Sequence, residues 1–173
     1  MILWLSSYPK SGNTWVRIFL STLIYSRNNI VNFENLSRIR TFPKMRDFNG
    51  LCENVQDRDE LIKKWITAQE ALNLNTDIKI FKTHNVMCNV KGHNFSNLEN
   101  SLGVIYVVRD PRNVLSSIMN HFSISDQNEA KNFIQNDYNW IGLTKNGAKK
   151  VTEIPIYIGS VSYTHLTLPT TYG

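Results

Sequence analysis

The chain has 173 residues, the length of one domain large enough to bury a core. Hydrophobic residues make up 42% of it and aromatic residues 11%, a composition that excludes a disordered chain. The net charge of +5 comes without any block of lysine and arginine, so charge gives no reason to expect a nucleic-acid partner. This mild positive excess fits an anionic ligand, and it equally fits an ordinary basic surface.

The cysteines and the start of the chain predict a reducing, cytoplasmic setting. Cys52 and Cys88 are the only cysteines and form no C-x-x-C pair, so we expect free thiols. His84, Cys88 and His93 match no common zinc spacing, and we expect no metal site. Apolar residues follow Met1 directly, without a basic leader, and no apolar run could span a bilayer, so we expect no membrane partner.

The first 25 residues predict a strand, a tight loop and a helix. Residues 2–5 form a continuous apolar run, typical of a strand buried in a parallel sheet. Pro9 and Gly12 mark the loop. Apolar residues then recur at helical spacing, which predicts a helix over about residues 12–25.

The middle of the chain predicts a long loop, a helix and a second strand. Residues 28–56 are polar and irregular, and we expect a functional loop with one short helix. Asp57 and Glu60 form a capping-box pattern, which predicts one amphipathic helix reaching Leu72. The second strand, over residues 78–81, ends at Lys82, Thr83 and His84.

The clearest strand covers residues 103–108, with Arg109 as its last residue. Asp110 suits an N-cap and Pro111 the first position of the helix that follows. A further helix is predicted over residues 127–143, with these side chains facing inward: Ala130, Phe133, Ile134, Tyr138 and Ile141.

This alternation of strands and helices predicts an α/β domain with a mainly parallel central sheet. Ligands in such domains bind beyond the carboxyl ends of the strands. Lys10, His84 and Arg109 each come directly after a strand. We therefore expect these three residues at one edge of the sheet, although they lie far apart in the sequence.

The loop after the first strand has the residues of an anion-binding cradle. Backbone N–H groups at a helix start are unpaired and carry partial positive charge. Gly12 permits close approach, Ser11 and Thr14 add hydroxyl donors, and Lys10 adds a full charge that could neutralise a leaving group. The lysine precedes the glycine, so this is not the G-x-x-x-x-G-K-[ST] loop. The alternative is a plain strand–helix turn with Lys10 in solvent.

Arg109 and Ser117 are candidates for a second anion site. They are two helical turns apart, so they share an anion only if it lies along the flank of the helix. The alternative is a surface arginine–carboxylate pair and an unrelated serine. His84 could take a proton from a hydroxyl group, although a histidine in isolation more often has a structural role. His121 closes the helix and would interact with its C-terminal dipole.

Together these residues resemble the sulfotransferase family that uses 3′-phosphoadenosine 5′-phosphosulfate (PAPS). Residues 8–15 resemble its 5′-phosphosulfate loop, T-Y-P-K-S-G-T-T-W, with Asn13 at a frequent threonine. Residues 81–84 resemble the segment that carries its catalytic histidine, and residues 108–117 its 3′-phosphate segment, R-N-P-K-D-x-x-x-S. The resemblance covers about residues 1–160 and implies a P-loop-like, three-layer fold.

The resemblance implies a role for each matched residue. Lys10 would contact the bridging oxygen and stabilise the departing 3′,5′-bisphosphate, and Lys82 would bind the transferring sulfuryl group. His84 would be the general base that activates the hydroxyl or amine of a small-molecule or glycan acceptor, and no metal would be needed. The 3′-phosphate would be bound by Arg109 and Ser117, and the 5′ end by Ser11, Gly12, Asn13, Thr14 and Trp15.

The sequence departs from the family near its end. The family's domain normally continues with another strand and a glycine-rich segment, so we expect residues 1–160 to be the N-terminal part of a domain incomplete at its C-terminus. Residues 161–173 carry no charged side chain and four threonines, and we expect a non-native tail. An open sheet edge predicts weak stability and impaired activity.

Two other classes of function stay open. A P-loop kinase or nucleotide hydrolase would bind a nucleoside triphosphate with Mg²⁺ through a G-K-[ST] loop. A non-catalytic module would bind adenosine bisphosphate or another anion and would not depend on His84. The acceptor loop, residues 28–56, holds aromatic and basic side chains that fit a phenol, a sugar, an amine or a lipid equally.

Overall fold

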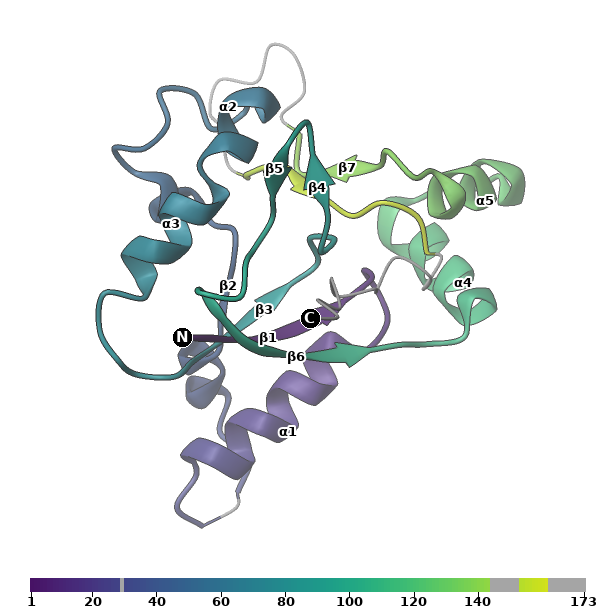
Figure 1. Ribbon diagram of the computed structural model, residues 1–173. Helices are drawn as coiled ribbons and strands as arrows, with labels where there is room; N and C mark the ends of the chain where they lie inside the picture. Colours follow the sequence, from purple (N-terminus) through teal and green to yellow (C-terminus); the bar gives the residue numbers. More distant parts are fainter. Residues whose placement is uncertain (29, 144–152, 162–173) are drawn as a thin grey trace, which may run out of the picture.

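A four-stranded parallel sheet lies at the centre of the computed structural model, which describes residues 1–28, 30–143 and 153–161 (Figure 1). Strand β1 is central and pairs in parallel with β3 and β6, so that Leu5 lies opposite Lys82 and Ile105. The shared direction puts all four carboxyl ends at one edge, and it confirms the predicted α/β class. The strand order is β2 (Arg40–Thr41), β3 (Lys79–Thr83), β1 (Ile2–Ser7) and β6 (Ser101–Val107).

Helices cover both faces of the sheet, which gives the domain three layers (Figure 1). Helix α1 (Asn13–Tyr25) packs on one face through Val16 and Leu20. Helices α2 (Arg58–Lys63) and α3 (Trp65–Leu72) cover the other face. The largest buried side chains of this second layer are Trp4, Phe42, Phe48, Trp65, Phe81 and Phe95.

Trp4 lies in the middle of that aromatic core. Its ring centroid is 5.6 Å from that of Phe42 and 5.5 Å from that of Phe95, and its Nε1 donates to Ser101 Oγ at 2.9 Å. Burying a side chain of this size stabilises a fold by about 1.5–3 kcal/mol. The core thus holds β1 firmly in place, and with it the loop that follows.

The expected long loop is more ordered than the sequence indicated. It contains two 3₁₀ helices, η1 (Phe33–Arg38) and η2 (Met45–Phe48), where one short helix was predicted. The edge strand β2 lies between them, and a two-residue strand has too few alternating positions to be read from a pattern. The Phe42 N–H donates to the Lys82 carbonyl at 2.9 Å, so this segment stays beside β3 beyond the strand itself.

The prediction of one continuous helix up to Leu72 is wrong, because this segment divides at Lys64 into two helices, α2 and α3. Asp57 caps α2 as predicted, through hydrogen bonds to two N–H groups of the first turn. Glu60 does not complete a capping box. Its carboxylate instead accepts hydrogen bonds from the N–H groups of Glu53 at 2.6 Å and Asn54 at 2.9 Å, and so ties down the preceding loop.

Helices α4 (Pro111–Phe122) and α5 (Gln127–Gln135) pack together beyond the carboxyl end of β6 (Figure 1). The prediction that α5 extends to residue 143 is wrong. The Asn139 side chain donates to the Phe133 carbonyl at 2.8 Å, a hydrogen bond that competes with the helical pattern.

The chain leaves α5 to form a small antiparallel sheet. Strand β7 (Trp140–Ile141) pairs with β8 (Ile156–Tyr157). Tyr138, which was predicted to face inward, is 82% exposed. A second hairpin joins β4 (Asn89–Val90) to β5 (His93–Asn94). No helix among the described residues is long and apolar enough to cross a membrane.

Candidate active site

The loop between β1 and α1 turns through two residues of left-handed backbone conformation. Gly12 has a φ of 99° and Lys10 a φ of 68°. Glycine adopts this region freely, whereas a lysine there is strained, a feature that concentrates at functional sites. No side chain of the described residues caps α1, so its first backbone N–H groups stay available to an anion.

Two polar side chains of this loop are buried. Asn13 Nδ2 donates to the Leu5 carbonyl and to Ser7 Oγ, both at 3.1 Å, which ties the first turn of α1 to β1. Ser11 Oγ is buried and has no hydrogen-bond partner among the described residues. A buried hydroxyl without a partner is uncommon in proteins, and a bound anion would supply the missing acceptor.

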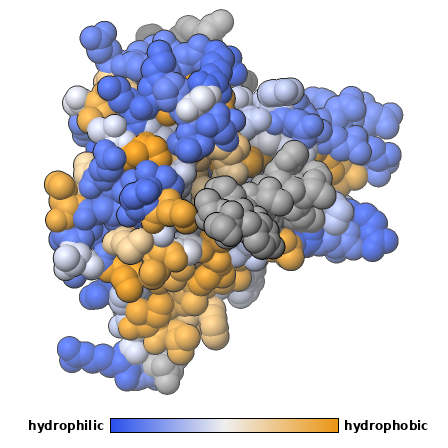
Figure 2. Space-filling view, in the orientation of Figure 1, coloured by the Kyte–Doolittle hydropathy of each residue, from blue (hydrophilic) through white to orange (hydrophobic). Residues whose placement is uncertain are grey.

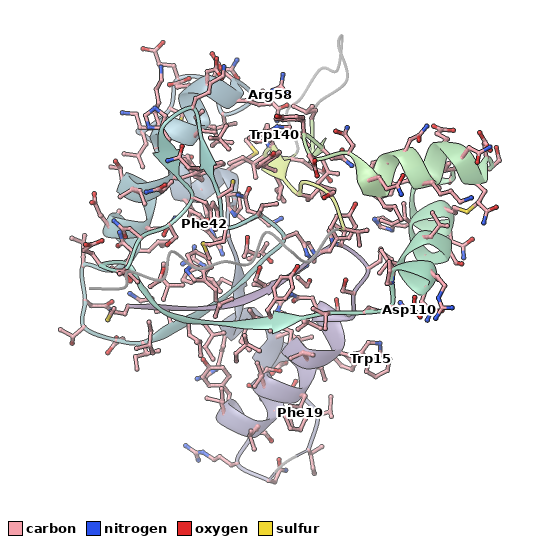
Figure 3. All side chains as sticks on the ribbon, turned by 45° about the vertical axis from the view of Figure 1, so that its right-hand side comes forward. Trp15, Phe19, Phe42, Arg58, Asp110 and Trp140 are labelled. Atoms are coloured by element: carbon pink, nitrogen blue, oxygen red, sulfur yellow. The ribbon has the colours of Figure 1, made fainter. Side chains whose placement is uncertain are left out.

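The two sequence motifs meet at one edge of the sheet. Arg109 Nη1 donates to the Lys10 carbonyl at 3.1 Å, across the ends of the adjacent strands β6 and β1. The carboxylate next to Arg109 in the sequence is engaged elsewhere, because Asp110 pairs with Arg112 at 2.6 Å. Ser117 lies two turns into α4 and is half-buried. In Figure 3, Trp15 projects from the start of α1 at the end of the sheet where Asp110 begins α4.

His84 follows β3, and its hydrogen bonds fix the tautomer of the ring. Its Nδ1 lies 2.8 Å from the Ser7 carbonyl, which can only accept, so Nδ1 carries the proton. Burial, together with the nearby Lys82 charge, lowers the pKa of His84 to about 4. The ring is therefore neutral near pH 7, and Nε2 has a lone pair that can accept a proton.

Lys82 lies among other cations. Burial lowers the pKa of its ammonium group, and repulsion from Arg17 and Lys44 lowers it further. Arg17 was not predicted as a site residue, because a single arginine on an amphipathic helix indicates a solvent-facing position. In the fold its Nη2 donates to the Leu36 carbonyl at 2.6 Å, while its Nε is buried without a partner among the described residues.

A cavity of about 460 Å³ opens beside His84. Ser7 and Tyr8 of the first loop border it, and Tyr106 and Tyr157 add aromatic walls. No group of three or more histidine, cysteine or acidic side chains within the described part of the chain could hold a metal ion. Cys52 and Cys88 are free thiols.

The parallel sheet and the helices on both of its faces define an α/β protein of the P-loop-like class, with an uncapped helix start and basic side chains at the carboxyl edge of the sheet. A family model described as "Sulfotransferase domain" matches residues 2–153, which is most of the chain. The chain therefore belongs to the sulfotransferase domain family, a family of transferases whose chemistry is sulfuryl transfer. A search of curated proteins found no match.

Proposed function

We propose that this protein transfers a sulfuryl group from PAPS to a hydroxyl or amine acceptor. The hydrogen bond between Arg109 and the Lys10 carbonyl carries the proposal, because it joins the two candidate anion-binding segments at neighbouring strand ends. A ligand with anionic groups at both ends suits such a pair of sites. Its 5′ end would lie against Ser11, Gly12, Asn13, Thr14 and Trp15, and its 3′-phosphate against Arg109 and Ser117.

The chemistry would be an in-line displacement at sulfur. The acceptor atom forms its bond to sulfur while His84 Nε2 takes its proton. The bond from sulfur to the bridging oxygen breaks, and its electron pair stays on the departing bisphosphate. Lys10 and the N–H groups of α1 would stabilise that charge, and Lys82 would orient the sulfuryl oxygens.

Calorimetric titration with adenosine 3′,5′-bisphosphate tests the donor site. We expect one molecule bound per chain, with an affinity that falls as salt rises, because the contacts are ionic. Adenosine triphosphate with Mg²⁺ should bind more weakly, since the loop lacks the G-K-[ST] sequence. Absence of bisphosphate binding would refute the proposal, and preference for the triphosphate would favour a kinase or hydrolase.

Replacing His84 by Ala separates an enzyme from a binding module. Removing a general base costs about 10²- to 10⁴-fold in rate, whereas the bisphosphate site does not include His84. We therefore expect sulfuryl transfer to collapse and bisphosphate affinity to stay within twofold or so of the wild type. Wild-type protein that binds the bisphosphate and transfers nothing would identify a non-catalytic module.

The division of the chain into a functional part and a tail can be tested as well. We propose that residues 1–160 form the cytoplasmic sulfotransferase part and that residues 161–173 carry no function; residues 162–173 lie outside the described part of the structure. Removing the tail should leave bisphosphate affinity unchanged, and a loss of affinity would contradict this division.

A further inference from the structure

Basic side chains continue along the carboxyl edge beyond those that the donor would use. The strand order is β2–β3–β1–β6, and all four strands run parallel. Arg109 follows β6 and Lys10 follows β1, so the donor site occupies that half of the edge. Lys82 lies near the end of β3, and Lys44 follows β2 closely. The half formed by β3 and β2 therefore carries Lys82, which would orient the transferring sulfuryl group, and Lys44, which the donor would not use.

Arg17 lies on α1, which packs against one face of the sheet. It extends from α1 toward η1, where its Nη2 bonds the Leu36 carbonyl. Lys44 lies on the segment that the Phe42–Lys82 backbone hydrogen bond holds beside β3. Arg17 and Lys44 both repel the Lys82 ammonium group, so each of them lies within electrostatic reach of Lys82.

None of these three cations forms an ion pair within the described residues. Asp47, three residues after Lys44, pairs with Arg40 at 2.7 Å and accepts the Lys44 backbone N–H at 2.9 Å. Glu153 borders the same cavity of about 260 Å³ as Lys44, without forming an ion pair with it. Partly buried charges of one sign are unfavourable until an anion binds.

The cavity of about 460 Å³ beside His84 differs in charge from this group of cations. Its described lining holds tyrosines and Asp137 but no lysine or arginine. An anionic acceptor would be repelled there by the carboxylate, whereas a neutral aromatic acceptor would fit it. The cavity beside His84 and the basic side chains near the ends of β3 and β2 would therefore select acceptors of different charge.

We propose that the acceptor is an alcohol or amine carrying an anionic group, a carboxylate or a phosphate ester, which Arg17 and Lys44 bind. This inference rests on the proposed sulfuryl transfer. In an in-line reaction the nucleophile attacks from the side opposite the leaving group. The leaving bisphosphate lies toward β1 and β6, so the acceptor approaches over β3 and β2. A guanidinium group favours paired hydrogen bonds to a carboxylate or phosphate.

Matched acids and amides test the charge requirement. Protein saturated with adenosine 3′,5′-bisphosphate is titrated with glucuronate or glucuronamide, and separately with para-hydroxyphenylacetate or its amide. Binding is followed by calorimetry and by ligand-observed NMR. We expect each acid to bind about tenfold or more tightly than its amide, the effect of one charge-assisted hydrogen bond. Where turnover with PAPS is measurable, kcat/KM should follow the same order.

The variants Arg17→Gln and Lys44→Ala should each reduce the preference for the acid, while leaving the bisphosphate affinity unchanged. Lys131→Ala removes an equal charge from an exposed position on α5 and is the matched control. Because Arg17 also bonds to η1, Arg17→Lys serves as a second variant that keeps the charge and should keep most of the preference.

The outcomes separate the two proposals. Bisphosphate that does not bind would remove the proposed function itself. Bisphosphate that binds while the amides match or exceed the acids, or while no acid binds at millimolar concentration, would overturn the anionic acceptor alone. An acid preference that survives in both Arg17→Gln and Lys44→Ala would place the anion elsewhere and overturn the assignment.

Discussion

Residues at the strand ends are positioned by hydrogen bonds to residues of other segments. Ser7 is the clearest example, because its hydroxyl accepts from Asn13 and its carbonyl accepts from His84. Asp110 engages Arg112 and so leaves its other neighbour, Arg109, to reach across to Lys10. Each of these contacts can be tested by substituting one side chain.

The depressed pKa of His84 predicts a pH dependence of stability. Its native pKa of about 4 lies below the unfolded value near 6.5, so the unfolded chain binds this proton more readily. The free energy of unfolding should fall by about 2–3 kcal/mol as the pH drops from 6.5 to 4. Urea denaturation at several pH values measures this. His84→Gln should flatten that part of the profile, and an unchanged profile would contradict the assignment.

Arg109 and its neighbour Arg112 form a matched pair for the donor site. Arg109→Ala should weaken binding of adenosine 3′,5′-bisphosphate about 10- to 100-fold, the loss expected for a charge-assisted hydrogen bond to a phosphate. Arg112→Ala removes the same charge from a guanidinium that Asp110 already occupies, and it should change the affinity little. Equal losses from both substitutions in the titration would show that only net charge matters.

At the level of elements, tight turns set the geometry between strands and helices. Gly12 joins β1 to α1, and a Cβ there would meet no atom within 4 Å. Gly142 follows β7, and a Cβ there would lie 2.5 Å from the Ile154 carbonyl oxygen. Both glycines have left-handed backbone conformations, so an alanine would be strained at either position. At position 142 its Cβ would also clash with the Ile154 carbonyl oxygen.

Alanine at these two glycines should therefore have different costs. Gly12→Ala should lower the free energy of unfolding by about 1–2 kcal/mol through backbone strain alone. Gly142→Ala should lower it by about 3 kcal/mol or more, because the Ile154 carbonyl must also move. Chemical denaturation measures both, and a Gly12 variant as unstable as the Gly142 variant would contradict this reading of the two turns.

Sequence patterns predicted the elements whose apolar residues recur within a single segment. The buried strands β1, β3 and β6 and the start of α4 at Pro111 were found in this way. The patterns missed β2, because it is defined by pairing with β3. They also missed the end of α5 at Gln135, where the Asn139 side chain bonds the Phe133 carbonyl. The position of Arg109 and Lys10 at one edge followed from the carboxyl ends of their parallel strands. Arg17 was missed because the groups that it bonds or repels lie on η1 and β3.

For the whole molecule, one face carries exposed apolar side chains. Figure 2 shows an apolar patch over the part of the surface where Figure 1 places α1 and β6. Phe19 and Leu23 on α1 are 64% and 60% exposed, and Leu102 and Val108 are exposed at β6. Strand β6 is an edge strand of the described sheet, and residues 101–108 contain no charged side chain to protect that edge.

This face should make the protein self-associate. Replacing Phe19 and Leu23 together by Lys should shift the sedimentation profile toward smaller species and leave bisphosphate affinity unchanged. Lysines at Asn132 and Gln135, which are exposed on α5, add the same charge without removing apolar surface. Equal improvement with the control lysines would assign the effect to net charge.

Asn13 and His84 are both held by Ser7, and this has a consequence for how a ligand is received. The helix start that would face the donor and the imidazole that would face the acceptor share one anchor on a buried central strand. Both groups are already held in place before a ligand arrives, so little conformational entropy is lost on binding. The distance between the two reacting partners is thus set by folding, before either of them enters.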